Sequence, residues 1–488
     1  MFDEHPAAAT DRVEQSLPLV PSKITTVCRL CDLKSSPLSN FLLFSLFYSI
    51  THATVDAVLV FAAAELGTFV GSVAGATLYI CYTASALILA KPIVASVGPK
   101  LGVTIGLMSL LVYVLCFYLA ILIRPLSSIV FISGASIGGI GAGVLWTAQG
   151  SYYSSNASLY AQQENQSMSS TTTNFAAIFA AFYLSCEAIF KLLSTGVYLL
   201  GSSSTGHWQV VLFGLYSASA AASVMAFHFM VLPFPIMYRS AGSLSIDDMR
   251  GNSHTQIPTS DDDIAEDPSS GYSRPQESAI SNCYDLFIDQ SLAVLRAIRS
   301  DRKLCCLLPY QVCFGLTSGF VNTFINGSVV KSGLGEGYIG FLNGIAVLTA
   351  VLLAAPLACL SNSLPHGNWF IMVFGCSCYT FLGLTVATAP LHVLQRWDVM
   401  VVYFVVLGAS RGVWENTNKA VIAESFNDID YRETAYAAIY FSSGLAGAIG
   451  FSLALLISMD DFAVVLIATS VCSLIGYHLS TVSHLMDS

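Results

Sequence analysis

Residues 101–123 read LGVTIGLMSLLVYVLCFYLAILI, an apolar run without a charged side chain. A helix of about 20 apolar residues crosses the hydrocarbon core of a bilayer, so this run predicts a transmembrane helix. Runs of similar length and composition recur on both sides of it, twelve in all. They lie at about 40–62, 67–90, 101–123, 126–148, 174–197, 209–235, 304–326, 337–360, 367–388, 399–421, 434–458 and 462–483.

The composition of the 488 residues indicates a membrane protein. Hydrophobic residues make up 55% of the chain and charged residues only 10%. An ordinary soluble chain carries about 25% charged residues, because its surface must face water. This balance excludes an ordinary soluble domain, a disordered chain, a coiled coil and collagen. It predicts an all-α membrane protein whose surface is solvated by the lipid bilayer.

The segment between the sixth and seventh runs has a different composition. Residues 239–302 are rich in Ser, Asp, Gly and Pro, which is typical of a chain that buries no core. The acids of this segment account for most of the net charge of -10, and nothing in the charge pattern indicates a nucleic-acid partner. We predict a cytosolic tail at 1–38, a six-helix bundle at 39–238, an acidic and largely disordered cytosolic loop at 239–302, and a second six-helix bundle with a short tail at 303–488.

Two features of this acidic loop point to further roles. Ser260 precedes three aspartates, an acidic context that some kinases favour; a phosphate there would add about 1.5 to 2 negative charges, whereas the alternative is a plain solvated spacer. The end of the loop predicts an amphipathic helix at the inner membrane surface, with basic residues beside an apolar face. That face consists of Tyr284, Ile288, Leu292, Leu295 and Ile298.

Lys and Arg predict the orientation, since cytosolic loops retain positive charge. With both termini in the cytosol, fifteen of the 20 basic residues fall on the inner side and three on the outer side. The inner loop at 150–173 lacks a basic residue and holds sequons at Asn156 and Asn165, which should both be free of glycan in this orientation. No cleaved signal peptide is expected, so the first span would act as the targeting element. The sequence does not choose between the plasma membrane and an endolysosomal membrane.

Motifs for metal binding and catalysis are weak. Most of the 13 cysteines lie inside apolar runs, as small buried hydrophobic residues. Cys28 and Cys31 form a lone C-x-x-C, but a structural zinc needs four ligands, so we expect free or palmitoylated thiols, no metal and no cofactor. Gly134-Ala-Ser-Ile-Gly138 matches G-x-S-x-G, but it lies within a span, where the strand-to-helix turn of a hydrolase cannot form. The sequence therefore does not predict an enzyme.

Ionisable side chains inside the spans are candidate sites, because a charge in hydrocarbon is costly. His52 and Asp56 are four residues apart and share a face of the first span. They form either a proton or ion relay or a satisfied hydrogen-bonded pair near the end of the span. Glu187 and Lys191 repeat this spacing in the fifth span, where we favour an internal ion pair over a substrate contact.

The tenth span holds the densest polar group, which consists of Arg411, Trp414, Glu415, Asn416 and Lys419. Its charged members share one helical face, which lines a central cavity or forms a charge ladder that fixes this span to a neighbour. We favour the cavity. Other spans are expected to add hydrogen-bonding groups to the same cavity, namely Trp146, Gln149, Asn322 and Asn326.

Several motifs make the sequence similar to a known family. The most specific is Leu145-Trp146-Thr-Ala-Gln149-Gly150 with the tyrosines that follow. The others are Glu65-Leu-Gly67, Tyr79, Pro92, Gly98-Pro-Lys100, Gly138 and Gly141. On these residues the chain resembles the major facilitator superfamily, and within it the uncoordinated-ninety-three-like family of potassium-channel regulatory proteins. Two positions depart from the pattern: Ala95 stands where the general facilitator loop has an acid, and Glu415 stands where the family tends to have Gln.

The resemblance implies the major facilitator fold, with a gating loop that includes Pro92, Gly98 and Lys100. It further implies a protein that regulates or escorts a partner, either an ion channel, such as a potassium channel, or a receptor. The alternative is a secondary active transporter of a small solute or ion, which works by alternating access and is coupled to protons or cations. The titratable residues of spans 1 and 10 favour transport, whereas the degenerate loop from Lys91 to Lys100 favours the accessory role.

Overall fold

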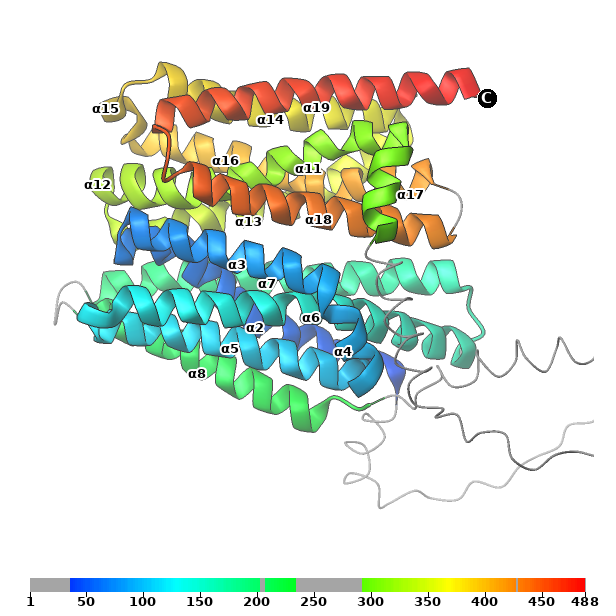
Figure 1. Cartoon of the computed structure of the whole chain (residues 1–488), viewed down its shortest axis with the longest axis horizontal. Coiled ribbons are helices and arrows are strands. Elements are labelled where there is room, and N and C mark those ends of the chain that lie inside the picture. The colour runs from blue at the N-terminus through cyan, green and yellow to red at the C-terminus, as the bar shows by residue number, and fades with distance from the viewer. Residues whose placement is uncertain (1–35, 202–206, 234–291, 427–428, 488) are drawn as a thin grey trace, which may run out of the picture.

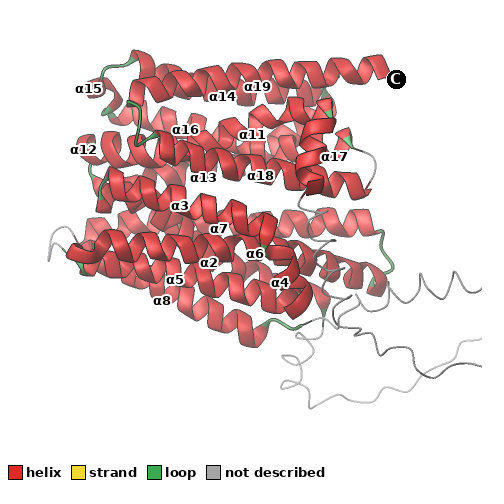
Figure 2. Ribbon diagram, viewed as in Figure 1, coloured by secondary structure: helices red, strands yellow, loops and turns green. Residues whose placement is uncertain are grey.

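The computed structural model describes residues 36–201, 207–233, 292–426 and 429–487. Every element in these residues is helical (Figure 2). Twelve helices are long and apolar enough to cross a membrane, so the protein is an integral, multi-pass membrane protein and the predicted number of spans is confirmed. Most of the predicted tail and acidic loop, residues 1–35 and 234–291, lies outside the described residues, and so do Ser260, Tyr284, Ile288, Cys28 and Cys31.

Six spans precede the acidic loop and form the lower group of helices in Figure 1, which we call the first half. A short helix, α4, follows the second span, and a single 3-10 turn, Arg124–Leu126, precedes the fourth. The helices of the first half are α2 (Pro37–Leu66), α3 (Thr68–Ile88), α4 (Ala90–Val97), α5 (Pro99–Leu122), α6 (Ser127–Gln163), α7 (Met168–Gly201) and α8 (Trp208–Met230).

The other six spans form the upper group in Figure 1, the second half. Two of these spans change to a π-helix part-way: α11 continues through Val321–Val330, and α16 through Trp414–Asn418. The helices are α11 (Arg302–Phe320), α12 (Lys331–Gly333), α13 (Ile339–Ser363), α14 (Gly367–Thr388), α15 (Leu391–Leu394), α16 (Trp397–Val413), α17 (Lys419–Ser425), α18 (Ile429–Leu453) and α19 (Met459–Asp487). A 3-10 turn at Glu336–Tyr338 leads into α13.

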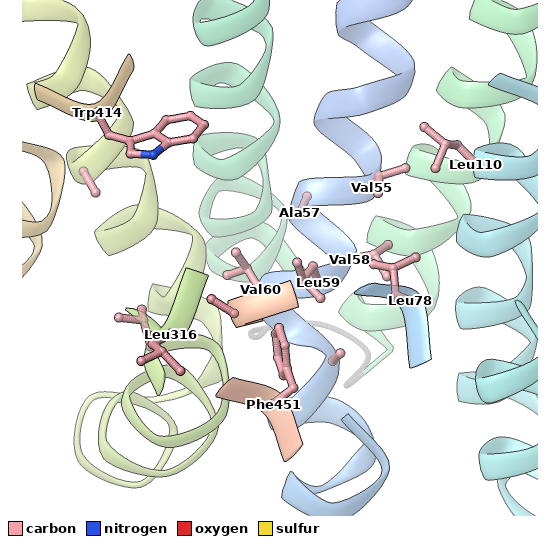
Figure 3. Packing of buried hydrophobic residues seen from close by; sticks show 14 of the residues in the cluster. Val55, Ala57, Val58, Leu59, Val60, Leu78, Leu110, Leu316, Trp414 and Phe451 are labelled. Carbon is pink, nitrogen blue, oxygen red and sulfur yellow. The ribbon is translucent and has the colours of Figure 1, made fainter. Parts of the chain in front are cut away.

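Helix α2 is central to the packing, because it is buried against both halves. Of its most apolar stretch, 72% is buried inside the protein. Figure 3 shows Val58 on the side of α2 that faces Leu78 of α3, and Val60 on the side that faces Leu316 of α11 and Phe451 of α18. One span of the first half therefore supplies apolar contacts to its own bundle and to the interface between the halves.

The halves meet most closely on one side of the membrane. Since the number of spans is even, α2 begins and α19 ends on the same side, which we call the terminal side; the opposite side is the far side. Near the far side the Ser72 and Thr323 hydroxyls lie 3.0 Å apart, and Thr195 donates a hydrogen bond to the Gly337 carbonyl at 2.8 Å. Lys331 also donates to the Ala64 carbonyl there. The structure is thus closed between the halves on the far side.

A short helix at residues 292–300 follows the acidic loop. Figure 1 shows it beside α17 on the terminal side, running across the ends of the spans rather than along them. Val294 and Ala297 are buried against the spans, whereas Leu292 and Leu295 are exposed. Ile298, the third described residue of the predicted apolar face, is partly buried and packs against the core. The helix therefore packs one side against the spans and leaves Leu292 and Leu295 exposed on the other.

The sequons differ in what they can report about orientation. Helix α6 extends to Gln163, so most of the predicted loop at 150–173 is helical. The side chain of Asn156 is fully buried in this helix and donates to the Tyr152 carbonyl at 3.2 Å, so a glycan there would be incompatible with the fold in either orientation. Asn165 is exposed in the turn between α6 and α7.

We predict that Asn165 carries no glycan when the protein is expressed in a eukaryotic cell, because the predicted orientation places this turn in the cytosol. Mass spectrometry of the peptide that contains Asn165 provides the measurement. A sequon inserted on an extended linker between α14 and α16, on the opposite side, is the positive control. A glycan on Asn165 would show that the orientation is inverted.

A glycine sets the distance between two spans of the second half. A Cβ atom at Gly319 of α11 would lie 2.5 Å from the Gly450 carbonyl carbon of α18, a backbone atom that cannot move aside. We expect Gly319→Ala to lower the free energy of unfolding by about 1–3 kcal/mol, seen as a lower thermal midpoint in detergent. Gly196→Ala in α7 is the matched control, since nothing lies within 4 Å of a Cβ there. Equal midpoints for both variants would contradict this close packing.

Candidate functional site

A buried carboxylate joins the two halves in the middle of the spans. Glu187 of α7 accepts hydrogen bonds from both terminal nitrogens of Arg411 of α16, at 2.6 and 2.7 Å. It also accepts one from Lys191 of its own helix at 2.5 Å, so the predicted ion pair is present. The Glu187 side chain is only 2% exposed. Its charge is therefore compensated by one cation from each half rather than by water.

The ion pairs continue along α16 and α17. Glu415 lies 4.0 Å from Arg411 and accepts a hydrogen bond from Lys419 at 2.6 Å. These charges follow the i, i+4 spacing of one helical face, as predicted. Side-chain exposure is 2% at Glu187, 20% at Arg411 and Glu415, and 32% at Lys419. The exposure of these side chains thus increases along α16 and α17 toward the terminal side.

A second polar group lies on α2 in the first half. His52 and Asp56 approach within 3.4 Å, and their side chains are 12% and 23% exposed. The His52 ring packs on Tyr183 of α7 and Trp146 of α6, with ring centroids 4.9 and 5.5 Å apart. Tyr183 precedes Glu187 by one helical turn, so the polar groups of α2 and α16 approach each other through α7.

Trp414, predicted to be a cavity side chain, is buried in the structure. Its indole nitrogen donates to the side-chain oxygen of Gln311 at 2.9 Å, and its ring stacks on Phe314 at 3.9 Å. Gln311 in turn donates to the side-chain oxygen of Asn418 at 2.8 Å. Trp414 therefore fixes α16 to α11 inside the second half. Gln311 and Asn418 were not predicted; the signal that could have found them is an amide side chain inside a span.

Asn322 and Asn326 are likewise buried inside the second half, not exposed in a cavity. Asn326 donates to Asn322 at 3.2 Å and accepts from Asn343 of α13 at 2.9 Å. The amides form a ladder that joins the π-helical part of the seventh span to the eighth. Asn343 is a further residue that the sequence analysis missed.

Two further predicted site residues, Gln149 and Asn416, are partly exposed. Gln149 follows Trp146 by one turn of α6 and is partly exposed. Asn416 precedes the exposed end of the charged chain, and its amide donates to the Gly412 carbonyl of its own helix at 2.9 Å. Both remain candidates for a contact with substrate.

The predicted gating loop is mostly helical. Pro92 lies in α4, and Gly98 separates α4 from α5 with a φ of 85°, a left-handed conformation that favours glycine. Lys100, at the start of α5, donates to the His228 carbonyl at the end of α8 at 3.0 Å. This segment fixes the terminal-side ends of three helices within the first half.

Metal ligands do not cluster in the part of the chain that the structure describes: no group there of three or more His, Cys, Asp or Glu side chains could hold a metal ion. The polar groups described above consist of charged, amide and aromatic side chains.

The arrangement of the twelve spans matches solved transporter structures. A POT family transporter in complex with a thioalcohol-conjugated peptide aligns over 91% of this chain and 96% of its own, with a TM-score of 0.58 and 12% identity. The nucleoside transporter NupG aligns over 90% and 98%, with a TM-score of 0.56 and 11% identity. This chain has the major facilitator fold. The fold implied by the sequence resemblance is thereby confirmed.

The comparisons do not identify a family within this fold. No family model matches the sequence, and no curated protein matches it. The solved structures are 10–13% identical to this chain, a level at which only the fold is shared. The narrower resemblance to the uncoordinated-ninety-three-like family stays a prediction.

We predict that the cost of breaking the central ion pairs is asymmetric. Glu187→Ala leaves both Arg411 and Lys191 without their buried partner, at a cost on the order of 3–5 kcal/mol. Arg411→Ala costs less, because Glu187 keeps Lys191. Thermal midpoints of the purified proteins in detergent provide the measurement. Asp398→Ala, which removes an exposed ion pair with Arg396, should leave the midpoint unchanged; a larger loss for Arg411→Ala than for Glu187→Ala would contradict the assignment.

Proposed function

We propose that this protein is a secondary active transporter, which moves a small solute or ion across the membrane by alternating access. The observation that carries the proposal is the ion pair between Glu187 and Arg411, which joins the two halves at mid-span beside side chains that solvent reaches. When the halves rock, this ion pair can break and its charged groups can bind water, a proton or a substrate instead. An apolar contact offers no such replacement.

The comparisons support transport over channel regulation. The similar structures are described as peptide and nucleoside transporters, so proteins of this fold move solutes of that size. The role of a regulator or escort of an ion channel, and any link to potassium, depends on the sequence resemblance alone. The transporters are also consistent with a protein that is not an enzyme.

The difference between the two sides of the membrane supports an alternating-access cycle. The halves are closed on the far side, and the exposure of the charged chain increases toward the terminal side. With the predicted orientation, this is a state open to the cytosol. Asp56, His52 and Glu415 are titratable and reached by solvent, and they are the residues that we propose to bind the coupling proton or cation.

Opening of the far side can be tested without knowledge of the substrate. Ser72 is fully buried between the halves, so a Ser72→Cys thiol should react with a membrane-impermeant maleimide only while the far side is open. We predict slow but measurable labelling, followed by mass spectrometry. The native Cys313 is the control, because it is fully buried within the second half and rocking does not expose it. Labelling of Ser72→Cys no faster than Cys313 would indicate a fixed scaffold.

Solute flux tests the transport function itself. Proteoliposomes of the full chain should accumulate at least one of uridine, dialanine and choline under an imposed proton or sodium gradient. We expect Asp56→Asn or Glu415→Gln to reduce that flux by roughly tenfold or more, since each removes a titratable charge from the site. Flux that neither variant changes would refute coupling at these residues. The absence of flux under every gradient would favour the accessory role.

A further inference from the structure

Asp56 differs from the other two carboxylates of the site in its partner. Glu187 and Glu415 each pair with Lys or Arg side chains, which remain charged. The ion pair of Asp56 is with His52, which is charged only when it is protonated. A neutral His52 thus leaves the Asp56 carboxylate without a permanently charged partner among the residues that the structure describes.

The charges of the site are unevenly distributed between its two ends. The chain of ion pairs through Glu187 and Glu415 contains three cations, Lys191, Arg411 and Lys419, against two carboxylates, which leaves one positive charge. Asp56 on α2 is the carboxylate of the site that lies outside this chain of ion pairs. A positively charged ligand group would accordingly be attracted to the α2 end of the site and repelled from the α17 end.

Aromatic rings gather around His52, the partner of Asp56. The rings of Tyr48, His52, Trp146 and Tyr183 are neighbours, with centroid separations from 4.9 to 6.5 Å; we call these four rings the Asp56 cage. Trp146 and Tyr183 are partly exposed. The faces of Trp and Tyr rings attract cations, most strongly where water is partly excluded.

One polar atom of the cage is also available for a hydrogen bond. The Tyr48 hydroxyl is buried and has no hydrogen-bond partner among the residues that the structure describes, whereas the His52 Nδ1 atom faces the Asp56 carboxylate at 3.4 Å. A buried polar atom without a partner is costly, so such atoms tend to mark places where a water or ligand completes the structure. Tyr48 lies on α2 about two helical turns before Asp56.

We infer that the Asp56 cage binds the ammonium group of a small organic cation. The carboxylate supplies the countercharge, the Trp146 and Tyr183 rings supply cation–π contacts, and the unpartnered Tyr48 hydroxyl supplies a hydrogen bond to a polar substituent. The inference rests on the proposed function in that this ligand would be the transported substrate. Binding itself requires only the cage and not transport.

The test compares choline with its neutral isostere 3,3-dimethyl-1-butanol, in which a carbon atom replaces the quaternary nitrogen. Binding to the purified full-length protein in detergent is measured by saturation-transfer NMR at pH 7.5. We expect choline to bind at least tenfold more tightly than the isostere. Asp56→Asn, which keeps the shape but removes the charge, should weaken choline binding by tenfold or more and leave isostere binding unchanged.

The controls distinguish binding at the Asp56 cage from general effects of charge and folding. Trp146→Leu should weaken choline binding severalfold, whereas Asp398→Asn, the same chemical change at an exposed far-side residue, should have no effect. Thermal midpoints show whether each variant is folded. Equal binding of choline and its isostere, no binding of either, or full choline binding by folded Asp56→Asn would overturn the inference. Choline binding without any solute flux would support the cage and refute the transport function.

Discussion

The buried carboxylate of Glu187 is the constraint on which the relation between the two halves depends. A charge inside a membrane costs several kcal/mol unless it is paired, and Glu187 is paired with one cation from each half. The halves cannot separate at this level unless Arg411 is replaced by another partner, such as water, a proton or a ligand. An ion pair that is costly to break, but whose partners can be replaced, is well suited to a protein that changes between two conformations.

The polar side chains of the second half have a different role. Gln311, Trp414 and Asn418 bond to one another between α11 and α16, and the amides of Asn326 and Asn343 join the seventh span to α13. Amide hydrogen bonds between neighbouring helices in a membrane have few competing partners, so they hold these helices in register. Each set lies at a π-helical segment, where the normal hydrogen-bonding pattern is interrupted. The second half is thus held together by neutral polar groups, whereas the mid-span contact between the halves, Glu187 with Arg411, is charged.

Sequence patterns predicted the spans well and their ends less well. Hydropathy identified all twelve spans, because only apolar side chains are stable against lipid. It ended the fourth span near residue 148, whereas α6 continues to Gln163, since a helix can extend beyond the bilayer with polar side chains. The i, i+4 pairs of Glu187 with Lys191 and of Glu415 with Lys419 were predictable, because one helix alone determines them. The direction of Trp414 was not, because it depends on where Gln311 of another span lies.

The sequence by itself determined that the chain crosses a membrane, how many times it does so, and which few ionisable residues lie inside. These properties follow from the composition of local segments. Only the tertiary structure decided that Glu187 bonds to Arg411, more than two hundred residues away, and that aromatic rings from three helices gather around His52, the partner of Asp56. The physical reason is that lipid contact selects apolar segments one at a time, whereas the partner of a buried charge is selected by the packing of helices against one another.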